Sequence, residues 1–339
     1  MFVVLQYGHG LFGSYDEVGY GSSSYLWQDA TDFGYVLAAS TWIGLSGQDV
    51  PAAMRVLGTD ITDFAYIPDR TVQGVVNALG LMTMMKGRFS RDPAMLTSDG
   101  KPILDTSKTA YTGNSEGGIL GTVYMAASQE VKRGVLGVPG GPYSLLLPRS
   151  LDFSLEFDML KLRYMDPVDR INLMQVMQML WDRAEPSGFM RTVNDQLLPD
   201  TPSHDVLFQY GLGDAQVSWL AAQSAARATN SVMYASNAKE HNEDFFGFEM
   251  LNDDQKVTGR SGIQGFDFMS PQAPLQNVPP GTEGDTHEDV RRDPNARAQL
   301  GNFLLTGEIS NTCGGTCVAE PTARPPKHTL IPKGVVAEE

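Results

Sequence analysis

Gly113-Asn114-Ser115-Glu116-Gly117 is the stretch of this sequence that decides the fold, because it places a serine between small residues at a predicted turn. Such a turn from strand to helix holds its central residue in a strained backbone conformation and exposes the hydroxyl. Side chains at the two outer positions would collide with the neighbouring strand and helix, so glycine is expected there. The helix that follows would direct N–H groups and its positive dipole end at the reacting centre. We therefore interpret Ser115 as a candidate nucleophile.

Predicted strands and helices alternate along the chain on both sides of this turn. Compact apolar runs predict strands at 2–7, 35–40, 110–112, 134–138, 205–210 and 231–235. Helical periodicity predicts helices at 70–86, 118–127, 217–228 and 295–306. Residues 266–285 are rich in proline and glycine and are predicted to form a long loop. Alternating apolar strands and helices favour an α/β fold with a doubly wound, mostly parallel sheet.

Residues 143–200 interrupt this alternation. Methionine and leucine recur there at helical spacing, and no strand is predicted. We interpret the segment as a helical cap or lid inserted over the carboxyl edge of the sheet, with methionines that either face the substrate or form plain core. The chain then divides into 1–142 and 201–312, the two parts of one catalytic domain, and 313–339, a cysteine loop with a poorly ordered tail.

Length and composition bound the class of protein. The 339 residues, 42% of them hydrophobic, can bury one large core that carries an insertion. A formal net charge of −15 argues against binding nucleic acid or an anionic membrane surface. No apolar run reaches the ~18 residues of a membrane span, and residues 1–7 lack the basic start of a signal peptide.

Cys313 and Cys317 enclose a short loop that contains glycine. This spacing favours a disulfide; free thiols are the alternative, and a metal site would need further ligands that do not cluster nearby. A disulfide favours an exported protein, extracellular or periplasmic, although no signal peptide identifies the destination. Neither a metal nor a cofactor is predicted.

A serine hydroxyl needs a neighbouring base to act as a nucleophile near neutral pH. The chain has five histidines: His9, His204, His241, His287 and His328. His287 fits best, because it lies on a loop between the last predicted strand and the last predicted helix. The carboxyl edge of a doubly wound sheet gathers functional residues on such loops. His241 lies in a charged segment that is typical of solvent-exposed surface.

The base in turn needs a carboxylate that orients it. Asp214 follows an apolar strand and a glycine turn, which places it at the mouth of the predicted sheet. Its other interpretation is the N-cap of the following helix, and one side chain can serve both purposes. Asp267 and Asp285 are the alternative candidates.

The tetrahedral intermediate of acyl transfer needs two N–H donors for its oxyanion. The backbone of Glu116, directly after the serine, is one candidate. The other is expected in the glycine-rich loop that follows the first strand, at Leu11 or, as second choice, at Phe12.

These elements occur in the order glycine loop, Ser, Asp, His: His9-Gly10-Leu11-Phe12-Gly13, the Ser115 turn, Gly213-Asp214 and His287. From Phe2 to Thr306 the sequence resembles the α/β-hydrolase superfamily, nearest to its bacterial lipases and esterases. The resemblance implies a Ser-Asp-His triad, a two-donor oxyanion hole and a cap after the sixth strand of the family. In such lipases the residue after His-Gly supplies an oxyanion N–H, which corresponds to Leu11.

Two features depart from the family pattern. Two strands normally precede the His-Gly loop, whereas only residues 1–7 precede it here. The chain is therefore expected to be a natural truncation, a fragment, or a homo-oligomer in which another subunit covers the sheet edge. Glu116 occupies a position that is often uncharged in relatives, so its carboxylate is expected to point away from the oxyanion.

The predicted function is hydrolysis of a carboxylic ester, from a small molecule or a lipid, through an acyl-enzyme on Ser115. An amidase, thioesterase or acyltransferase would keep the same triad and change the pocket. The alternative from another class is a noncatalytic binding protein with a hydrolase-like fold.

Overall fold

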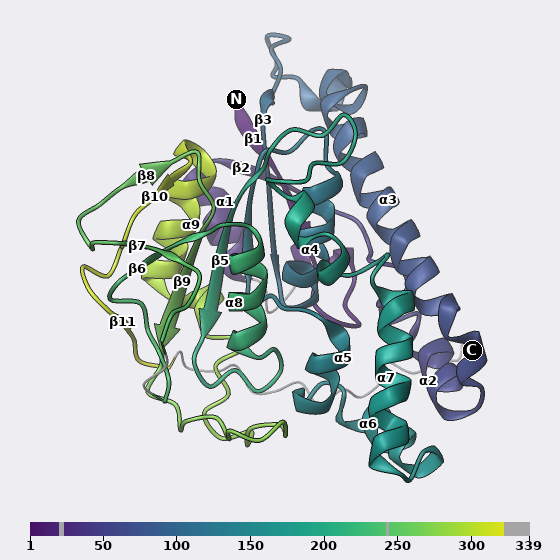
Figure 1. Ribbon diagram of the computed structural model, residues 1–339. Coiled ribbons are helices and arrows are strands. Elements are labelled where there is room, and N and C mark those ends of the chain that lie inside the picture. The colour runs from purple at the N-terminus through teal and green to yellow at the C-terminus, as the bar shows by residue number, and fades with distance from the viewer. Residues whose placement is uncertain (20–23, 242–243, 322–339) are drawn as a thin grey trace, which may run out of the picture.

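The computed structural model of the protein (Figure 1) describes residues 1–19, 24–241 and 244–321. A nine-stranded sheet of order β2-β1-β3-β4-β5-β9-β6-β7, with β11 beside β9, forms its centre, and every adjacent pair is parallel. The strands of this sheet are β1 (Phe2–Gly8), β2 (Tyr35–Ala39), β3 (Leu104–Asn114), β4 (Arg133–Gly137), β5 (Asp205–Gly211), β6 (Val232–Tyr234), β7 (Glu249–Leu251), β9 (Gly262–Asp267) and β11 (Cys317–Val318). A separate antiparallel pair joins β8 (Val257–Thr258) and β10 (Glu308–Ile309).

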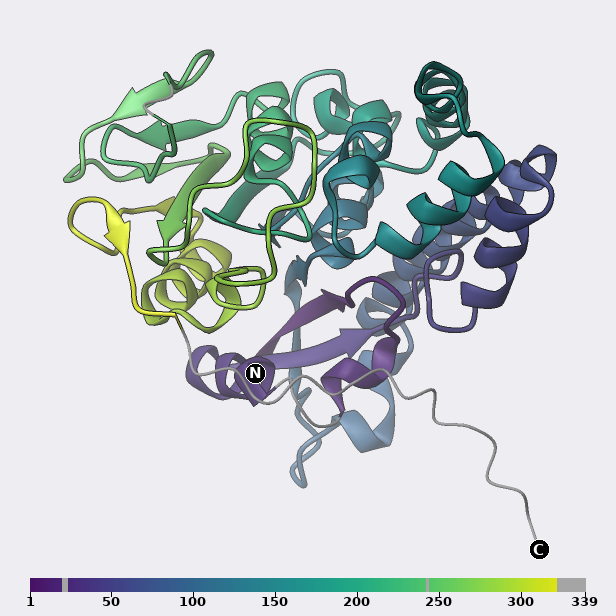
Figure 2. The ribbon, with the colours of Figure 1, turned by 90° about the horizontal axis from the view of Figure 1, so that it is seen from below.

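Helices cover both faces of the sheet (Figures 1 and 2). One face carries α3 (Tyr66–Lys86), α4 (Glu116–Ala127) and α8 (Trp219–Ala228), and the other carries α1 (Ser24–Phe33) and α9 (Pro294–Thr306). The remaining helices are α2 (Val50–Gly58), α5 (Tyr143–Leu146), α6 (Ser154–Arg163) and α7 (Pro167–Trp181). The sheet is therefore doubly wound, as predicted.

Alternate side chains of the central strands enter two separate cores. Val206 and Phe208 pack on the side of α3, α4 and α8, whereas Leu207, between them, packs on the side of α9. This burial on both faces explains why the central strands are continuous apolar runs. Strand β2 forms one edge of the sheet and pairs, within the described part of the chain, only with β1.

The insertion predicted at 143–200 contains α5, α6 and α7 and, in this fully described stretch, no strand. Its helices pack against α2 around an apolar cluster that includes Phe64, Trp181 and Leu160. Two methionines, Met174 and Met177, belong to this cluster, whereas Met179 is 74% exposed. The methionines of this segment thus lie both in the core and on the surface.

The structure confirms the predicted strands and helices and adds elements that the sequence did not indicate. The most important is β9, which lies between β5 and β6 and extends into the segment predicted as a loop from residue 266. Helices α1 and α2 and the short strands β7, β8, β10 and β11 were also not expected. The predicted tail, residues 322–339, and His328 lie outside the described residues.

The predicted disulfide between Cys313 and Cys317 is present, and Cys317 is the first residue of β11, which pairs with the end of β9. None of the described helices is long and apolar enough to cross a lipid bilayer.

Candidate active site

Ser115 lies on a sharp turn between β3 and α4, at the carboxyl end of the strand. Its backbone has φ 60° and ψ −125°, a conformation that residues other than glycine seldom adopt. The turn is stabilised by a hydrogen bond from the Ser115 N–H to the Gly137 carbonyl of β4, at 2.9 Å. The N–H groups of Gly118 and Ile119 donate back to the Ser115 carbonyl and start the helix. The serine is thus held rigidly by its neighbours.

The predicted need for glycine on both sides of the serine is confirmed by the packing. A Cβ atom on Gly117 would lie 2.0 Å from the Gly8 carbonyl oxygen, and one on Gly113 would lie 2.4 Å from the Gly117 oxygen. Strands β1 and β3 and helix α4 therefore meet backbone against backbone beneath the serine.

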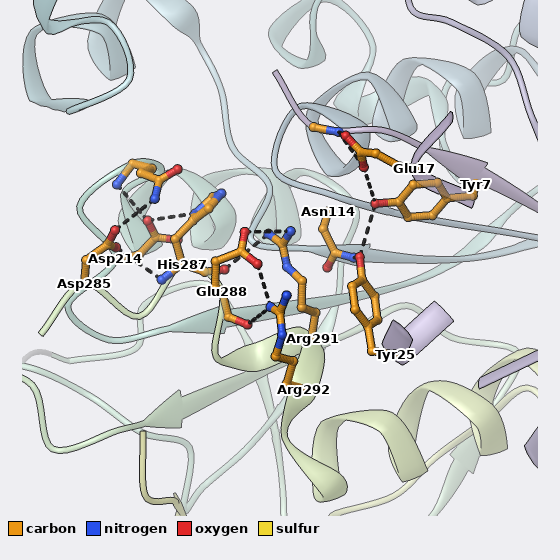
Figure 3. A network of polar contacts seen from close by, with 12 residues as sticks. Tyr7, Glu17, Tyr25, Asn114, Asp214, Asp285, His287, Glu288, Arg291 and Arg292 are labelled. Carbon is orange, nitrogen blue, oxygen red and sulfur yellow. Dashed lines mark hydrogen bonds and ion pairs between the residues drawn. The ribbon is translucent and has the colours of Figure 1, made fainter. Parts of the chain in front are cut away.

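Asp214 and His287 are brought into direct contact, although they are 73 positions apart in the chain. The Nδ1 atom of His287 lies 2.8 Å from Oδ2 and 3.0 Å from Oδ1 of Asp214 (Figure 3). Both side chains are buried. A carboxylate in this position fixes the ring with its Nδ1–H toward the acid and leaves Nε2 to accept a proton.

The other interpretation of Asp214, the N-cap of the following helix, is wrong in position, because the N-cap of α8 is Ser218. The Oδ1 of Asp214 instead accepts the backbone N–H groups of Gln216 and Val217, both at 2.8 Å, and closes the turn that leads into α8. Hydrogen bonds within the loop that carries Asp214 therefore orient its carboxylate, in addition to the contact with His287.

Asp285, an alternative acid in the sequence, instead joins the two loops. Its Oδ1 accepts the N–H of Ala215 at 3.0 Å and the N–H of His287 at 3.2 Å, and its Oδ2 accepts Nε2 of Gln216 at 2.9 Å. Asp285 thus ties the loop that carries Asp214 to the loop that carries His287 (Figure 3).

The electrostatic setting suits a base. Burial opposes the charged ring, but the charge and hydrogen bond of Asp214 outweigh it, so the pKa of His287 is raised from its ordinary value. The nearby Arg291 charge acts in the opposite direction, and Asp152 supports the increase.

The loop after β1 presents the donors expected for an oxyanion. The N–H of Phe12 donates to the Leu45 carbonyl at 2.9 Å, so it is already occupied. Among the residues that the structure describes, the N–H groups of Leu11 and Glu116 have no hydrogen-bond partner. These are the two donors that the sequence favours, and Leu11 lines the same pocket as Ser115.

His9 holds this loop in place. Its Nε2 accepts the Trp42 N–H at 2.7 Å, so the proton resides on Nδ1, which donates to the Gly10 carbonyl at 2.8 Å. Burial lowers the pKa of His9 to about 4, and the ring is therefore neutral near pH 7.

Glu116 points away from the pocket, as its sequence position requires. Its carboxylate accepts a hydrogen bond from the hydroxyl of Tyr143, the first residue of α5. Burial raises the pKa of Glu116 to about 7, against the opposing effect of the Tyr143 hydrogen bond. The side chain thus connects the serine turn to α5.

Ser115 and His287 line one pocket of about 360 Å³, together with Leu11. The rest of its wall is largely polar or charged and includes Glu17, Asp152, Gln216, Glu288, Arg291 and Arg292. These six residues are scattered along the chain and follow no local motif, so the sequence alone does not predict them.

Other sequence candidates lie elsewhere. The Nε2 atom of His241 lies 2.8 Å from the Ala273 carbonyl, and the ring of His204 lies between the carbonyls of Val193 and Ser128. Asp267 accepts the Met269 N–H at the end of β9. None of these three lines the Ser115 pocket. Within the described residues, no three His, Cys, Asp or Glu side chains are grouped as metal ligands.

Comparisons with solved structures give matches of low sequence identity. Acetyl xylan esterase 1 from Thermoanaerobacterium sp. JW/SL YS485 matches 81% of this chain and 71% of its own, with 14% identity and a TM-score of 0.44. An acylaminoacyl peptidase from Pyrococcus horikoshii matches 90% of this chain but only 36% of its own, with 14% identity and a TM-score of 0.46. The Pyrococcus furiosus esterase Pf2001 matches 89% of this chain and 82% of its own, with 12% identity and a TM-score of 0.43. No protein-family model and no curated protein matches the sequence.

The strand order and the placement of the loops define the fold. The loops that carry Ser115, Asp214 and His287 follow β3, β5 and β9, and these parallel strands end at the same edge of the sheet. The three residues occur in the chain order Ser, Asp, His and lie on loops at one edge of a doubly wound parallel sheet, which is the arrangement of the α/β-hydrolase fold.

Proposed function

We propose that this protein is a serine hydrolase that cleaves carboxylic esters, with Ser115, His287 and Asp214 as its triad. The observation that carries the proposal is the buried contact of 2.8 Å between Asp214 and His287, together with the pocket that His287 and Ser115 both line. A buried pair of this kind, next to a serine on a strained turn, has the parts that activate a hydroxyl.

The reaction proceeds in two halves. Ser115 attacks the ester carbonyl while His287 takes the hydroxyl proton, and the N–H groups of Leu11 and Glu116 stabilise the oxyanion. The tetrahedral intermediate collapses, and His287 returns the proton to the departing alcohol. Water, activated by His287, then releases the acid from the acyl-enzyme.

The character of the pocket supports short, polar esters over long acyl chains. Its volume of about 360 Å³ is near the lower end for small-molecule pockets, and charged side chains form much of its wall. We therefore expect turnover of p-nitrophenyl esters to fall steeply from acetate to palmitate.

Labelling by a fluorophosphonate probe tests the chemistry directly. The wild-type protein should be labelled, whereas Ser115→Ala should not, with the folded state of both verified by circular dichroism. No labelling of the folded wild type would favour the noncatalytic binding protein. Labelling without turnover of esters would direct the search to amides, thioesters or acyl acceptors.

A matched pair of histidine variants tests the base. His287→Ala should lower kcat by roughly 10⁴-fold or more, whereas His241→Ala should retain activity. The reverse outcome would show that the base is assigned to the wrong residue.

A further inference from the structure

Three carboxylates form part of the pocket beside Ser115, and they differ in their partners. Glu17 accepts hydrogen bonds from the Tyr7 hydroxyl at 2.9 Å and from the Gly10 N–H at 3.3 Å (Figure 3). Glu288 forms ion pairs with both Arg291 and Arg292. The Asp152 carboxylate has no hydrogen bond or ion pair with any residue that the structure describes.

The backbone of Asp152 is nevertheless firmly placed. The preceding N–H, of Leu151, donates to the Ala215 carbonyl at 3.0 Å, which fastens this part of the cap to the loop after Asp214. The N–H of Asp152 itself donates to Ser150 Oγ at 3.2 Å, and the next side chain, Phe153, packs on the apolar cap cluster. A half-buried carboxylate on such a support is positioned before any ligand arrives.

The surroundings of Asp152 are short of positive charge. Burial and the negative charges of Asp214, Asp285 and Glu156 raise its pKa, and only His287 lowers it. The two arginines of the pocket are committed to Glu288. A cation would therefore relieve an unfavourable concentration of negative charge at this position.

We propose that Asp152 selects substrates that carry a positively charged ammonium group, held beside Ser115 during ester cleavage. This inference rests on the proposed serine hydrolase activity and specifies its substrate class. The ammonium would lie next to the Asp152 carboxylate, which forms no ion pair with any described residue. This pairing would orient the ester in the pocket.

Pairs of esters that differ only in charge provide the test. On the alcohol side the pair is acetylcholine and the ester in which carbon replaces its nitrogen. On the acyl side it is the p-nitrophenyl ester of γ-butyrobetaine and the corresponding carbon isostere. We expect the wild type to prefer the cationic member of at least one pair in kcat/KM, and Asp152→Asn to reduce that preference about tenfold.

Three controls keep the result specific. Asp158→Asn removes the same charge from an exposed position on the cap, where Asp158 pairs with Lys161, and should leave the preference unchanged. Asp152→Glu should retain most of it. Added NaCl should weaken the preference of the wild type, because salt screens the attraction between the ammonium and Asp152. This control needs no substitution.

The two proposals fail in different ways. A preference absent from both ester pairs, or unchanged in Asp152→Asn, would overturn the role of Asp152 while Ser115-dependent hydrolysis of the neutral esters continues. Failure of the wild type to hydrolyse any ester, or hydrolysis that survives Ser115→Ala, would overturn the proposed function itself.

Discussion

The hydroxyl of Tyr143 donates a hydrogen bond to the carboxylate of Glu116, so the side chain of the residue after the serine points toward α5. Glu116 therefore combines a carboxyl group, whose pKa is raised by burial to about 7, with the backbone N–H that is a proposed oxyanion donor.

Glu116 should make stability depend on pH. Its pKa in the folded state is about 7, above the ordinary 4.5, so its contribution to stability is complete below pH 4.5 and is lost as the pH rises through 7. Glu116→Gln removes this loss, and relative to the variant the wild type should lose about 3 kcal/mol of unfolding free energy over that range. Urea unfolding at several pH values measures the difference. The exposed Glu283→Gln variant should follow the wild type, and parallel curves for wild type and Glu116→Gln would contradict the expectation.

Gly117→Ala should destabilise the protein by more than about 3 kcal/mol, because its Cβ would meet the Gly8 backbone at 2.0 Å. Gly80 in α3 is the matched control, since a Cβ atom there would have no described atom within 4 Å outside its own helical surroundings. Gly80→Ala should stabilise the protein by up to about 1 kcal/mol. Thermal unfolding compares the two, and similar effects in both variants would disprove the close backbone contact.

The acid limb of the pH–rate profile should reflect His287. The base must be neutral to act, and the carboxylate of Asp214 raises its pKa above 6.5, so kcat/KM should fall as the pH drops through a midpoint above 6.5. Arg291→Met removes a charge that lowers the His287 pKa and should move this midpoint to higher pH. A midpoint that stays in place, with both proteins folded, would show that Arg291 does not act on the base.

Variants of three aspartates distinguish the residue that acts as the acid from the residue that positions the histidine loop. Asp214→Ala should lower kcat by about 10⁴-fold. Asp285→Ala should cost about 10- to 100-fold, because it frees the histidine loop without removing the acid. Asp267→Ala, at the end of β9, should change kcat less than about twofold. The largest loss at Asp285 or Asp267 would transfer the role of acid to that residue.

Sequence reasoning was effective where a local pattern has one physical cause. The glycines around Ser115, the apolar runs of the central strands and the loop positions of Asp214 and His287 each follow from such a cause, and the structure places them accordingly. The assignment of catalytic roles to these residues remains a prediction.

Strand β9 shows why other parts could not be predicted. Its sequence, GIQGFD, has two glycines and a central glutamine, which argue against a buried strand. The reasons lie far away in the chain: a Cβ on Gly265 would meet the ring of Tyr210 at 2.5 Å, and Gln264 bonds to Asn237 at 3.1 Å. The pocket wall was missed for the same reason, since only the fold brings Glu17, Asp152 and Arg291 together.

The hydrogen bonds that join Asp285 to the loops of Asp214 and His287 affect how the sequence of this fold can vary. Because Asp285 binds the N–H groups of Ala215 and His287, the position of the histidine is set by the neighbouring loop and not by the path of the chain from β9. The exposed residues 275–278 contribute no hydrogen bond to Asp214 or His287, so insertions or deletions there should leave the contact between the acid and the base in place.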